Sequence, residues 1–215
     1  MKKIAVLGSG QVGQVLADGF LKHGHEVMRG SREPGKLAAW KESKGAKART
    51  GTFAEAARFG EIAVLAVKGS AALEVVKACE GGLDGKSVLD ATNPIADAPP
   101  KDGVVAFFTG PNDSLLERLQ TAAPSAHFVK AFSSVGAALM VNPDLGGIKP
   151  SMFICGNDDG AKAEARTILD AFGWETEDMG TATAARAIEP MCMLWCIPGF
   201  LRNDWAHAFK MLRPR

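Results

Sequence analysis

The 215-residue sequence contains no tyrosine and only four histidines. Without tyrosine, the chain cannot use the tyrosine–lysine proton relay of short-chain dehydrogenases. It also has no HExxH pattern and no cysteine pairs at metal-ligand spacing, which argues against a catalytic metal. The histidines do not cluster along the chain and are interpreted as structural. We therefore expect neither a catalytic side chain nor a metal ligand.

Net charge and long apolar runs are lacking as well. Lysine and arginine total 25 against 24 acidic residues, so the formal charge of +1 provides no basic field for nucleic acid or anionic lipid. The apolar run Ile4 to Leu7 is shorter than the roughly 7 to 15 residues of a signal peptide. No run approaches the ~18 residues of a membrane span. The sequence therefore predicts a cytoplasmic protein with no nucleic-acid or membrane partner.

Cysteine is scarce, and its four positions carry no secretory signal. Four cysteines in a chain of this length favour reduced thiols over a disulfide framework. Cys192 and Cys196 would share one face of a helix, but no further metal ligands lie nearby in the sequence. We interpret all four as packing residues.

Short β-type runs alternate with helical stretches along most of the chain, the pattern of a parallel sheet with crossover helices. Eight strands are expected: Lys3 to Leu7, His25 to Arg29, Ala46 to Arg49, Ile62 to Val67, Ser87 to Asp90, His127 to Ala131, Ser151 to Cys155 and Trp174 to Glu177. The continuously apolar runs are typical of strands buried on both faces. The sequence predicts an α/β protein with a doubly wound, mostly parallel sheet of about eight strands.

Four helices with recognisable caps are expected between these strands. They are Gln11 to Lys22 with Gly24 as its C-cap, a helix opened by the capping box Thr52 to Glu55, a helix capped by Ser70 that runs to Cys79, and Asp159 to Ala171 with Asp158 as its N-cap. The last ~35 residues are richer in methionine, tryptophan and leucine. There, Ala182 to Ala187 and Met191 to Met211 are expected to be helical, with breaks at Pro190 and Pro198.

The division of the chain follows from this change in composition. Residues 1–180 are expected to form the sheet domain, and residues 181–215 a C-terminal helical segment. The apolar residues between Met191 and Leu212 are expected either to complete the core of the monomer or to form a homodimer.

A glycine motif, Gly8-Ser9-Gly10-Gln11-Val12-Gly13, directly follows the first expected strand and opens the first expected helix. In that context Gly8 permits the tight turn, Gly10 leaves room for a pyrophosphate, and Gly13 lets the helix pack close to the strand. The helix N-terminus offers N–H groups to the phosphates. The motif therefore predicts a Rossmann-type dinucleotide site, with all six residues of the motif binding the cofactor.

The end of the second expected strand decides between the two pyridine nucleotides. NAD sites usually carry an acid there for the ribose 2′-OH, but this chain reads Arg29-Gly30-Ser31-Arg32, with Lys36 following. Ser31 can donate to a 2′-phosphate, and Arg32 can pair with it while covering the adenine. Glu33 argues the other way, because its carboxylate could neutralise Arg32 or meet a 2′-OH. On balance the sequence favours NADP(H), bound here by Ser31, Arg32 and Lys36.

Two further turns follow the fourth and fifth expected strands, Ala66-Val67-Lys68-Gly69 and Asp90-Ala91-Thr92-Asn93-Pro94. Ligands of open parallel sheets bind outside the carboxyl ends of the strands. The residues expected to border the ribose and nicotinamide are therefore Ala66, Val67, Lys68, Asn93 and Pro94. The Asn93-Pro94 pair is equally compatible with an ordinary turn.

With these residues, the sequence resembles the NADPH-dependent reductases of the deazaflavin coenzyme F420. That family also resembles the cytoplasmic oxidoreductase domain of certain membrane metalloreductases. The resemblance spans nearly the whole chain. Besides the glycine motif, it rests on His25-Glu26-Val27, Gly30-Ser31-Arg32, Asp90 to Pro94, Val129-Lys130-Ala131-Phe132, Ala185-Arg186 and Glu189-Pro190-Met191.

The resemblance implies hydride transfer between NADP(H) and the deazaflavin, with the two rings face to face between the sheet and the C-terminal part. It also implies that Ser9 to Val12 hold the pyrophosphate, that Ser31, Arg32 and Lys36 hold the 2′-phosphate, and that Ala137 borders the nicotinamide. The chain departs from the family at Ser133, where the deazaflavin enzyme has a histidine. The second substrate is therefore left open between coenzyme F420 and a flavin.

Two expectations about function remain beside this one. A non-catalytic NADP(H)-binding or redox-sensing module would carry the same motif, because fold and cofactor site do not establish turnover. If the chain is an enzyme, its partner is expected to be a planar redox ring, since the side chains around the nicotinamide end are small and mostly apolar. The pocket for that ring is expected to be edged by Val67, Asn93, Phe132, Ser134, Ala137 and residues of the C-terminal segment.

Overall fold

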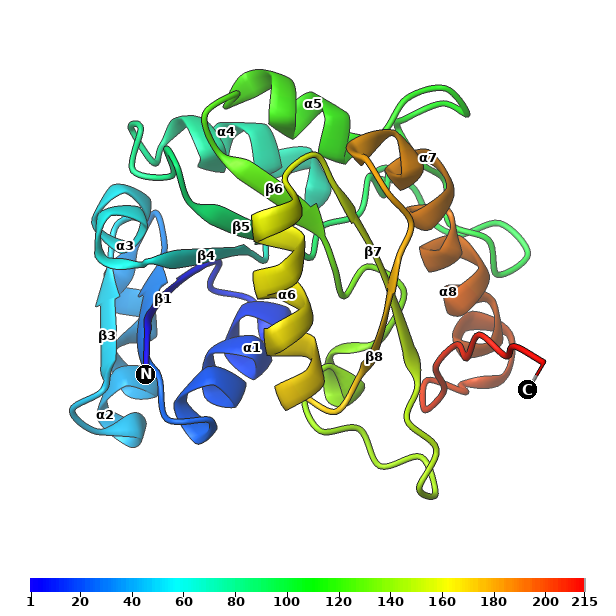
Figure 1. Cartoon of the computed structure of the whole chain (residues 1–215), viewed down its shortest axis with the longest axis horizontal. Coiled ribbons are helices and arrows are strands. Elements are labelled where there is room, and N and C mark those ends of the chain that lie inside the picture. The colour runs from blue at the N-terminus through cyan, green and yellow to red at the C-terminus, as the bar shows by residue number, and fades with distance from the viewer. Residues whose placement is uncertain (215) are drawn as a thin grey trace.

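The computed structural model, which describes residues 1–214, has one sheet with helices on both faces (Figure 1). Its strands are β1 (Lys3–Leu7), β2 (Glu26–Gly30), β3 (Ala48–Gly51), β4 (Ile62–Leu65), β5 (Ser87–Asp90), β6 (His127–Lys130), β7 (Ser151–Gly156) and β8 (Glu175–Asp178). They lie in the order β3-β2-β1-β4-β5-β6-β7-β8. Neighbours are parallel except β6 and β7, which are antiparallel. The predicted α/β class and mostly parallel sheet are confirmed, and the ends of each strand lie within two residues of the expected positions.

The helices are α1 (Gln11–Lys22), α2 (Ala38–Lys44), α3 (Phe53–Phe59), α4 (Ala72–Lys77), α5 (Leu115–Ala122), α6 (Asp159–Ala171), α7 (Ala185–Ile188) and α8 (Met191–Arg202). Short 3-10 turns lie at η1 (Pro34–Leu37), η2 (Gly69–Ala71), η3 (Ala137–Leu139) and η4 (Ala182–Ala184). Neither α2 nor α5 was predicted from the sequence. Both are short, at seven and eight residues, so their hydrophobic periodicity is brief.

The hydrophobic core has two parts, one on each face of the sheet, because successive side chains of a strand point to opposite faces. In β1, Ile4 and Val6 point to one face and Ala5 and Leu7 to the other, and all four are fully buried. Helices α1 and α6 pack over the first pair (Figure 1). Helices α3, α4, α5 and α7 pack over the second. This is the doubly wound arrangement that the apolar strand runs predict.

Of the four expected helix caps, two are confirmed, one is wrong, and the C-cap of α1 is His23, with Gly24 at φ +89° directly after it. Thr52 and Glu55 form the capping box of α3, with Glu55 N donating to Thr52 Oγ1 at 3.2 Å and Thr52 N donating to Glu55 Oε2 at 2.7 Å. Asp158 caps α6. Ser70 does not cap α4, because it lies inside the 3-10 turn η2 and the helix begins only after that turn.

The C-terminal segment is helical over a shorter stretch than predicted. Helix α8 ends at Arg202, and Pro198 lies inside it without breaking it. Asn203 then adopts a left-handed conformation, φ 55°, which reverses the chain as such residues do at helix ends. Residues 203–214, called the tail below, contain no helix. The tail returns to β7, where Ser151 N donates to the carbonyl of Phe209 at 2.9 Å.

The remaining features concern the cysteines, metals and membranes. The four cysteines are buried free thiols. Cys192 and Cys196 lie on the same face of α8 and pack with Val105 and Trp195. Within residues 1–214, no three histidine, cysteine, aspartate or glutamate side chains converge in a way that could hold a metal ion. In the same residues, no helix is long and apolar enough to cross a membrane.

Candidate functional site

The glycine turn between β1 and α1 is built by close contacts that exclude larger side chains. Gly8 has φ +149°, and a Cβ there would lie 2.1 Å from the carbonyl oxygen of Ala66. A Cβ on Gly13 would lie 2.6 Å from the Gly8 oxygen, so this glycine lets α1 start directly against the turn. A Cβ on Gly10, the N-cap of α1, would meet no heavy atom within 4 Å. The structure thus gives Gly8 and Gly13 their expected steric roles and leaves open space at Gly10.

A cavity of about 530 Å³ lies in front of this turn, at the carboxyl ends of β1, β2 and β4. The strand order reverses between β1 and β4, since β2 and β3 lie on one side of β1 and the later strands on the other. Ligands of open α/β sheets bind at such topological switch points. Many predicted site residues line it: Ser9, Gly10, Gln11, Val12, Ser31, Arg32, Ala66, Val67 and Lys68. Ala91, from the predicted turn after β5, also lines it, together with residues that were not predicted from the sequence: Phe53, Ala71, Glu74, Val75 and Ala78.

Beside the glycine turn, the end of β2 presents a cationic corner. Ser31 is 95% buried, and its Oγ accepts a hydrogen bond from Glu33 N at 3.1 Å. The Glu33 carboxylate pairs with Lys36 Nζ at 2.7 Å, and this hydrogen bond lowers the pKa of Glu33. Glu33 therefore pairs with Lys36, and Arg32 remains exposed at the edge of the cavity. Lys36 itself does not line the cavity.

A second cavity of about 310 Å³ continues from the first along β4 and β5. The two cavities share Val67, Lys68 and Ala91, and the second adds Asn93. Gly69 and Thr92 of the same two predicted turns also line it, and the rest of its wall was not predicted from the sequence: Ile95, Ala96 and Asp97. The two cavities together form one cleft, called the nucleotide cleft below.

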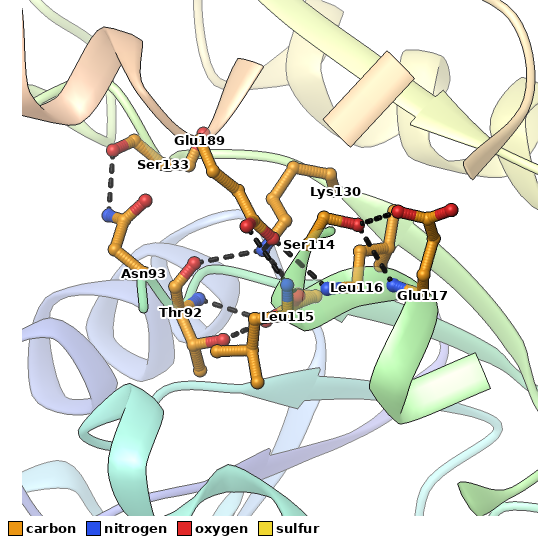
Figure 2. A network of polar contacts seen from close by, with 10 residues as sticks. Thr92, Asn93, Ser114, Leu115, Leu116, Glu117, Lys130, Ser133 and Glu189 are labelled. Carbon is orange, nitrogen blue, oxygen red and sulfur yellow. Dashed lines mark hydrogen bonds and ion pairs between the residues drawn. The ribbon is translucent and has the colours of Figure 1, made fainter. Parts of the chain in front are cut away.

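The turn after β5 is held in place from two sides. Asn93 Nδ2 donates to the carbonyl of Ser133 at 2.8 Å (Figure 2), while the Pro94 carbonyl accepts from Phe108 N at 2.9 Å. The contact with Ser133 orients the Asn93 amide, because only its nitrogen can donate to a carbonyl. Asn93 thus lines the cleft in a fixed orientation, and Pro94 lies behind it, outside both cavity walls.

A buried ion network lies beneath this turn (Figure 2). Lys130 Nζ lies 2.6 Å from Asp90 Oδ2 and 2.8 Å from Glu189 Oε1, and it donates to the Thr92 carbonyl at 2.9 Å. Asp90 Oδ1 accepts in turn from Thr92 N at 2.9 Å. Burial alone would lower the pKa of Lys130, but the Asp90 and Glu189 carboxylates outweigh it and raise that pKa above its usual value.

Glu189 extends this network to the C-terminal part of the chain. Its two oxygens accept from Leu115 N and Leu116 N, both at 3.0 Å, which satisfies free N–H groups at the start of α5 (Figure 2). Arg186, one turn earlier, binds Glu117 of α5 through two hydrogen bonds of 2.9 and 2.7 Å. Three of the segments that carry the sequence resemblance, those with Lys130, Arg186 and Glu189, therefore attach the C-terminal part beside the cleft.

The segment after β6 differs from the expected pocket edge. The Phe132 side chain is fully buried and packs toward Phe172 in the core, so it does not face the cleft. Ser134 is buried as well. A Cβ on Gly136 would lie 2.6 Å from the Trp195 ring, which shows how closely α8 packs on this segment. Ala137 opens η3, and it does not line either cavity.

A glycine turn, an adjoining cleft at the switch point and a cationic corner at the end of β2 define a dinucleotide-binding protein of the Rossmann type. The family model described as NADP oxidoreductase, coenzyme F420-dependent, matches residues 3–94. A solved structure from Arthrobacter sp. FB24, described as a proposed F420-dependent NADP-reductase, is 32% identical. It covers 99% of this chain, is itself covered completely, and superposes with a TM-score of 0.92. The chain belongs to this family and is an NADP(H)-binding oxidoreductase.

Two curated relatives are similar over most of the chain. The F420-dependent NADP reductase of Methanocaldococcus jannaschii is 28% identical over 203 residues, which are 89% of this chain and 90% of that protein. The metalloreductase STEAP3 of Rattus norvegicus is 28% identical over 204 residues, or 93% of this chain. The chain spans only 39% of the length of that metalloreductase.

Proposed function

We propose that this protein transfers a hydride between NADP(H) and the deazaflavin coenzyme F420. The observation that carries the proposal is the continuity of the nucleotide cleft. Its first cavity has the features of a dinucleotide site, and its second extends along β5 beyond the shared residues Val67, Lys68 and Ala91. Similarity to the Methanocaldococcus and Arthrobacter proteins supports coenzyme F420 as the partner, ahead of a flavin.

In this proposal, each part of NADP(H) binds to the residues predicted for it from the sequence. Ser9 to Val12 hold the pyrophosphate, because the open space at Gly10 allows phosphates to approach the N–H groups of α1. Ser31 and Arg32 bind the 2′-phosphate, with Lys36 beside them. The ribose and nicotinamide lie along Ala66 to Lys68 and Asn93, which line the cleft. Pro94 and Ala137 lie outside both cavity walls, so the expected contact of Ala137 with the nicotinamide is tested by the variant described below.

The protein's contribution to the reaction is alignment. Hydride transfer between two rings is supplied by the cofactors, and the protein has to hold them at roughly 3 to 3.5 Å from each other. The buried Lys130 network serves this purpose, since it fixes the Thr92 carbonyl and hence the turn that carries Asn93. The Asn93 contact with Ser133 connects the same turn to the segment before Ala137.

The test is direct reduction of an acceptor by NADPH. In stopped-flow mixing, we expect the protein to oxidise NADPH with coenzyme F420, and FMN or FAD to react much more slowly. If the flavins are reduced faster than coenzyme F420, a flavin is the second substrate, and the protein is still an NADP(H)-dependent oxidoreductase. Tight NADPH binding without oxidation by any of these acceptors would contradict the proposal and favour a redox-sensing module.

Ala137 provides a second test, located away from the 2′-phosphate corner. Ala137→Trp is expected to abolish hydride transfer, because the reaction depends on ring alignment to a fraction of an ångström. NADPH should still bind more tightly than NADH, since Arg32 is unchanged. Equal transfer rates in the variant would remove Ala137 from the nicotinamide site.

We also propose a homodimer formed through α8 and the tail. The buried face of α8 packs on its own chain, and Trp195 is only 7% exposed, so the helix does complete the core of the monomer. Large apolar side chains nevertheless remain exposed on its other face and in the tail: Leu194, Phe200, Leu201, Trp205 and Leu212. An apolar surface of this kind is typical of an interface. Light scattering that reports the monomer mass of 22.6 kDa at micromolar concentration would contradict the dimer.

A further inference from the structure

Arg29 lies beneath the glycine turn, whereas Arg32, three residues later, lies at the cationic corner of the cleft. It belongs to β2, pairs in register with Val6 of β1, and is only 1% exposed. Its Nη2 donates to the carbonyl of Gly8 at 3.4 Å and to that of Gly10 at 3.2 Å. The guanidinium therefore contacts the two glycine carbonyls that bracket Ser9.

The charge of this guanidinium has little compensation from the protein. Within residues 1–214, no carboxylate lies within 4.0 Å of it, and its buried Nε has no hydrogen-bond partner. Burial lowers the pKa of Arg29, while the more distant Asp18 carboxylate acts in the opposite direction. Arginine nevertheless remains protonated in proteins, so a cation is buried here.

The surroundings of Arg29 hold it in this position. Its guanidinium stacks over the Trp40 ring with the Cζ atom 4.9 Å from the centroid. Trp40 Nε1 donates to Asp18 Oδ1 at 2.8 Å, and Asp18 Oδ2 pairs with Lys44 at 2.9 Å. Asp18 is thus occupied by two other partners. A buried cation without an adjacent anion is unfavourable unless a counter-charge is supplied.

We propose that Arg29 is a positioning residue for the pyrophosphate of NADP(H), and that this pyrophosphate supplies the missing counter-charge. The inference rests on the proposed binding of the pyrophosphate at the glycine turn. Arg29 draws the Gly8 and Gly10 carbonyls toward the protein interior, which leaves N–H groups of the turn and of α1 for the phosphates. Its positive charge also acts on the phosphates through the turn, where the low dielectric strengthens the attraction.

This role predicts a signature that a purely structural arginine would not have. Replacing a buried, uncompensated cation with an apolar residue of similar size is often neutral or stabilising in the absence of ligand. Arg29→Met should therefore unfold at the same temperature as the native protein, or higher, while binding NADPH and NADH more weakly by about tenfold or more. The ratio of the two affinities should not change, because the 2′-phosphate lies at Arg32.

The experiment compares three variants by calorimetry and thermal unfolding. The ligands are NADPH, NADH and adenosine 2′-monophosphate, which lacks the pyrophosphate. Arg29→Met should weaken both dinucleotides equally and leave the monophosphate unchanged, and Arg29→Lys should recover part of the loss because it retains the charge. Arg32→Met, the matched control, should weaken NADPH and the monophosphate but not NADH.

Three results would overturn the inference. The first is unchanged dinucleotide binding by Arg29→Met. The second is equal loss for all three ligands, which would show that Arg29 supports only the fold. The third, if Arg29→Met does not fold, is an Arg29→Lys variant that binds all ligands as the native protein does. If Arg32→Met and Gly10→Ala also bind NADPH normally, the proposed placement of the cofactor fails as a whole.

Discussion

Lys130 of β6 and Glu189, the C-cap of α7, form an ion pair of 2.8 Å in which both side chains are almost completely buried. Asp90 makes a second ion pair with the same lysine, so one cation faces two carboxylates. The N–H groups at the start of α5 supply the remaining positive potential, because they point at the Glu189 oxygens. This arrangement attaches the C-terminal part to the turn that lines the nucleotide cleft.

The buried ion network predicts that substitution of Lys130 lowers the free energy of unfolding more than substitution of Glu189. Lys130→Met leaves two buried carboxylates without a cation and should lower the free energy of unfolding by about 3 to 5 kcal/mol. Glu189→Gln leaves Lys130 paired with Asp90 and retains an oxygen that can accept from α5, so its cost should be about 1 to 3 kcal/mol. Urea denaturation measures both. A Glu189→Gln variant at least as destabilised as Lys130→Met would contradict this account of the charges.

The glycine turn predicts opposite outcomes for two glycine-to-alanine changes. Gly13→Ala places a Cβ 2.6 Å from the Gly8 oxygen and should cost about 1 to 3 kcal/mol of stability through overpacking. Gly10→Ala meets no protein atom within 4 Å and has an ordinary φ of −76°, so the fold should be unaffected. Its methyl group would instead occupy space proposed for the pyrophosphate. Gly10→Ala should keep its melting temperature and lose NADPH affinity, and normal NADPH binding by this variant would place the pyrophosphate elsewhere.

The cationic corner predicts selectivity for the 2′-phosphate. Charge-assisted hydrogen bonds of this kind contribute about 1.5 to 3 kcal/mol, so NADPH should bind at least about tenfold more tightly than NADH. Arg32→Met should remove most of that difference by weakening NADPH alone, and Ser31→Ala should remove a smaller part. Isothermal calorimetry with both nucleotides measures this. Glu33→Gln serves as the control, since Glu33 pairs with Lys36, and it should leave the preference for NADPH in place.

Acid is expected to release the tail from the sheet. Arg213 binds Glu177 of β8 at 2.7 and 2.6 Å, and these hydrogen bonds lower the pKa of Glu177 below its usual 4.5. A carboxyl whose folded pKa is lowered contributes stability above its unfolded pKa and loses it as the pH falls through the folded value. The attachment should therefore be constant from neutral pH to about pH 5 and weaken progressively below about 4.5.

Hydrogen exchange of the tail between pH 3 and 7 measures this release. Glu177→Gln should expose the tail at every pH and flatten the profile. Glu175→Gln is the matched control, because it removes the neighbouring ion pair with Lys210 of the tail but leaves Glu177 to titrate. A native tail equally protected at pH 3 and pH 7 would show that the Arg213 contact does not hold it.

Local patterns in the sequence determined the sheet and the cofactor motif. Runs such as Ile4 to Leu7 in β1 are continuously apolar because they are buried on both faces of the sheet, and this pattern is visible in the sequence without knowledge of the neighbouring strands. The glycine motif is equally local, since it directly follows β1 and opens α1. Ser31 and Arg32 could be identified because they directly follow a strand whose carboxyl end borders the site.

Only the tertiary structure decided which charged side chains turn inward. Arg29 and Arg32 belong to one short run of sequence, but β2 directs the first beneath the glycine turn and leaves the second exposed at the cleft. The tail was predicted as a continuation of α8. In the structure, Asn203 reverses the chain and Trp205 packs so closely on Gly199 that a Cβ there would lie 2.3 Å from its ring. The inward position of Arg29 and the return of the tail to the sheet depend on contacts between residues distant in the sequence, Arg29 with Gly10 and Phe209 with Ser151. Neither periodicity nor helix propensity records such contacts.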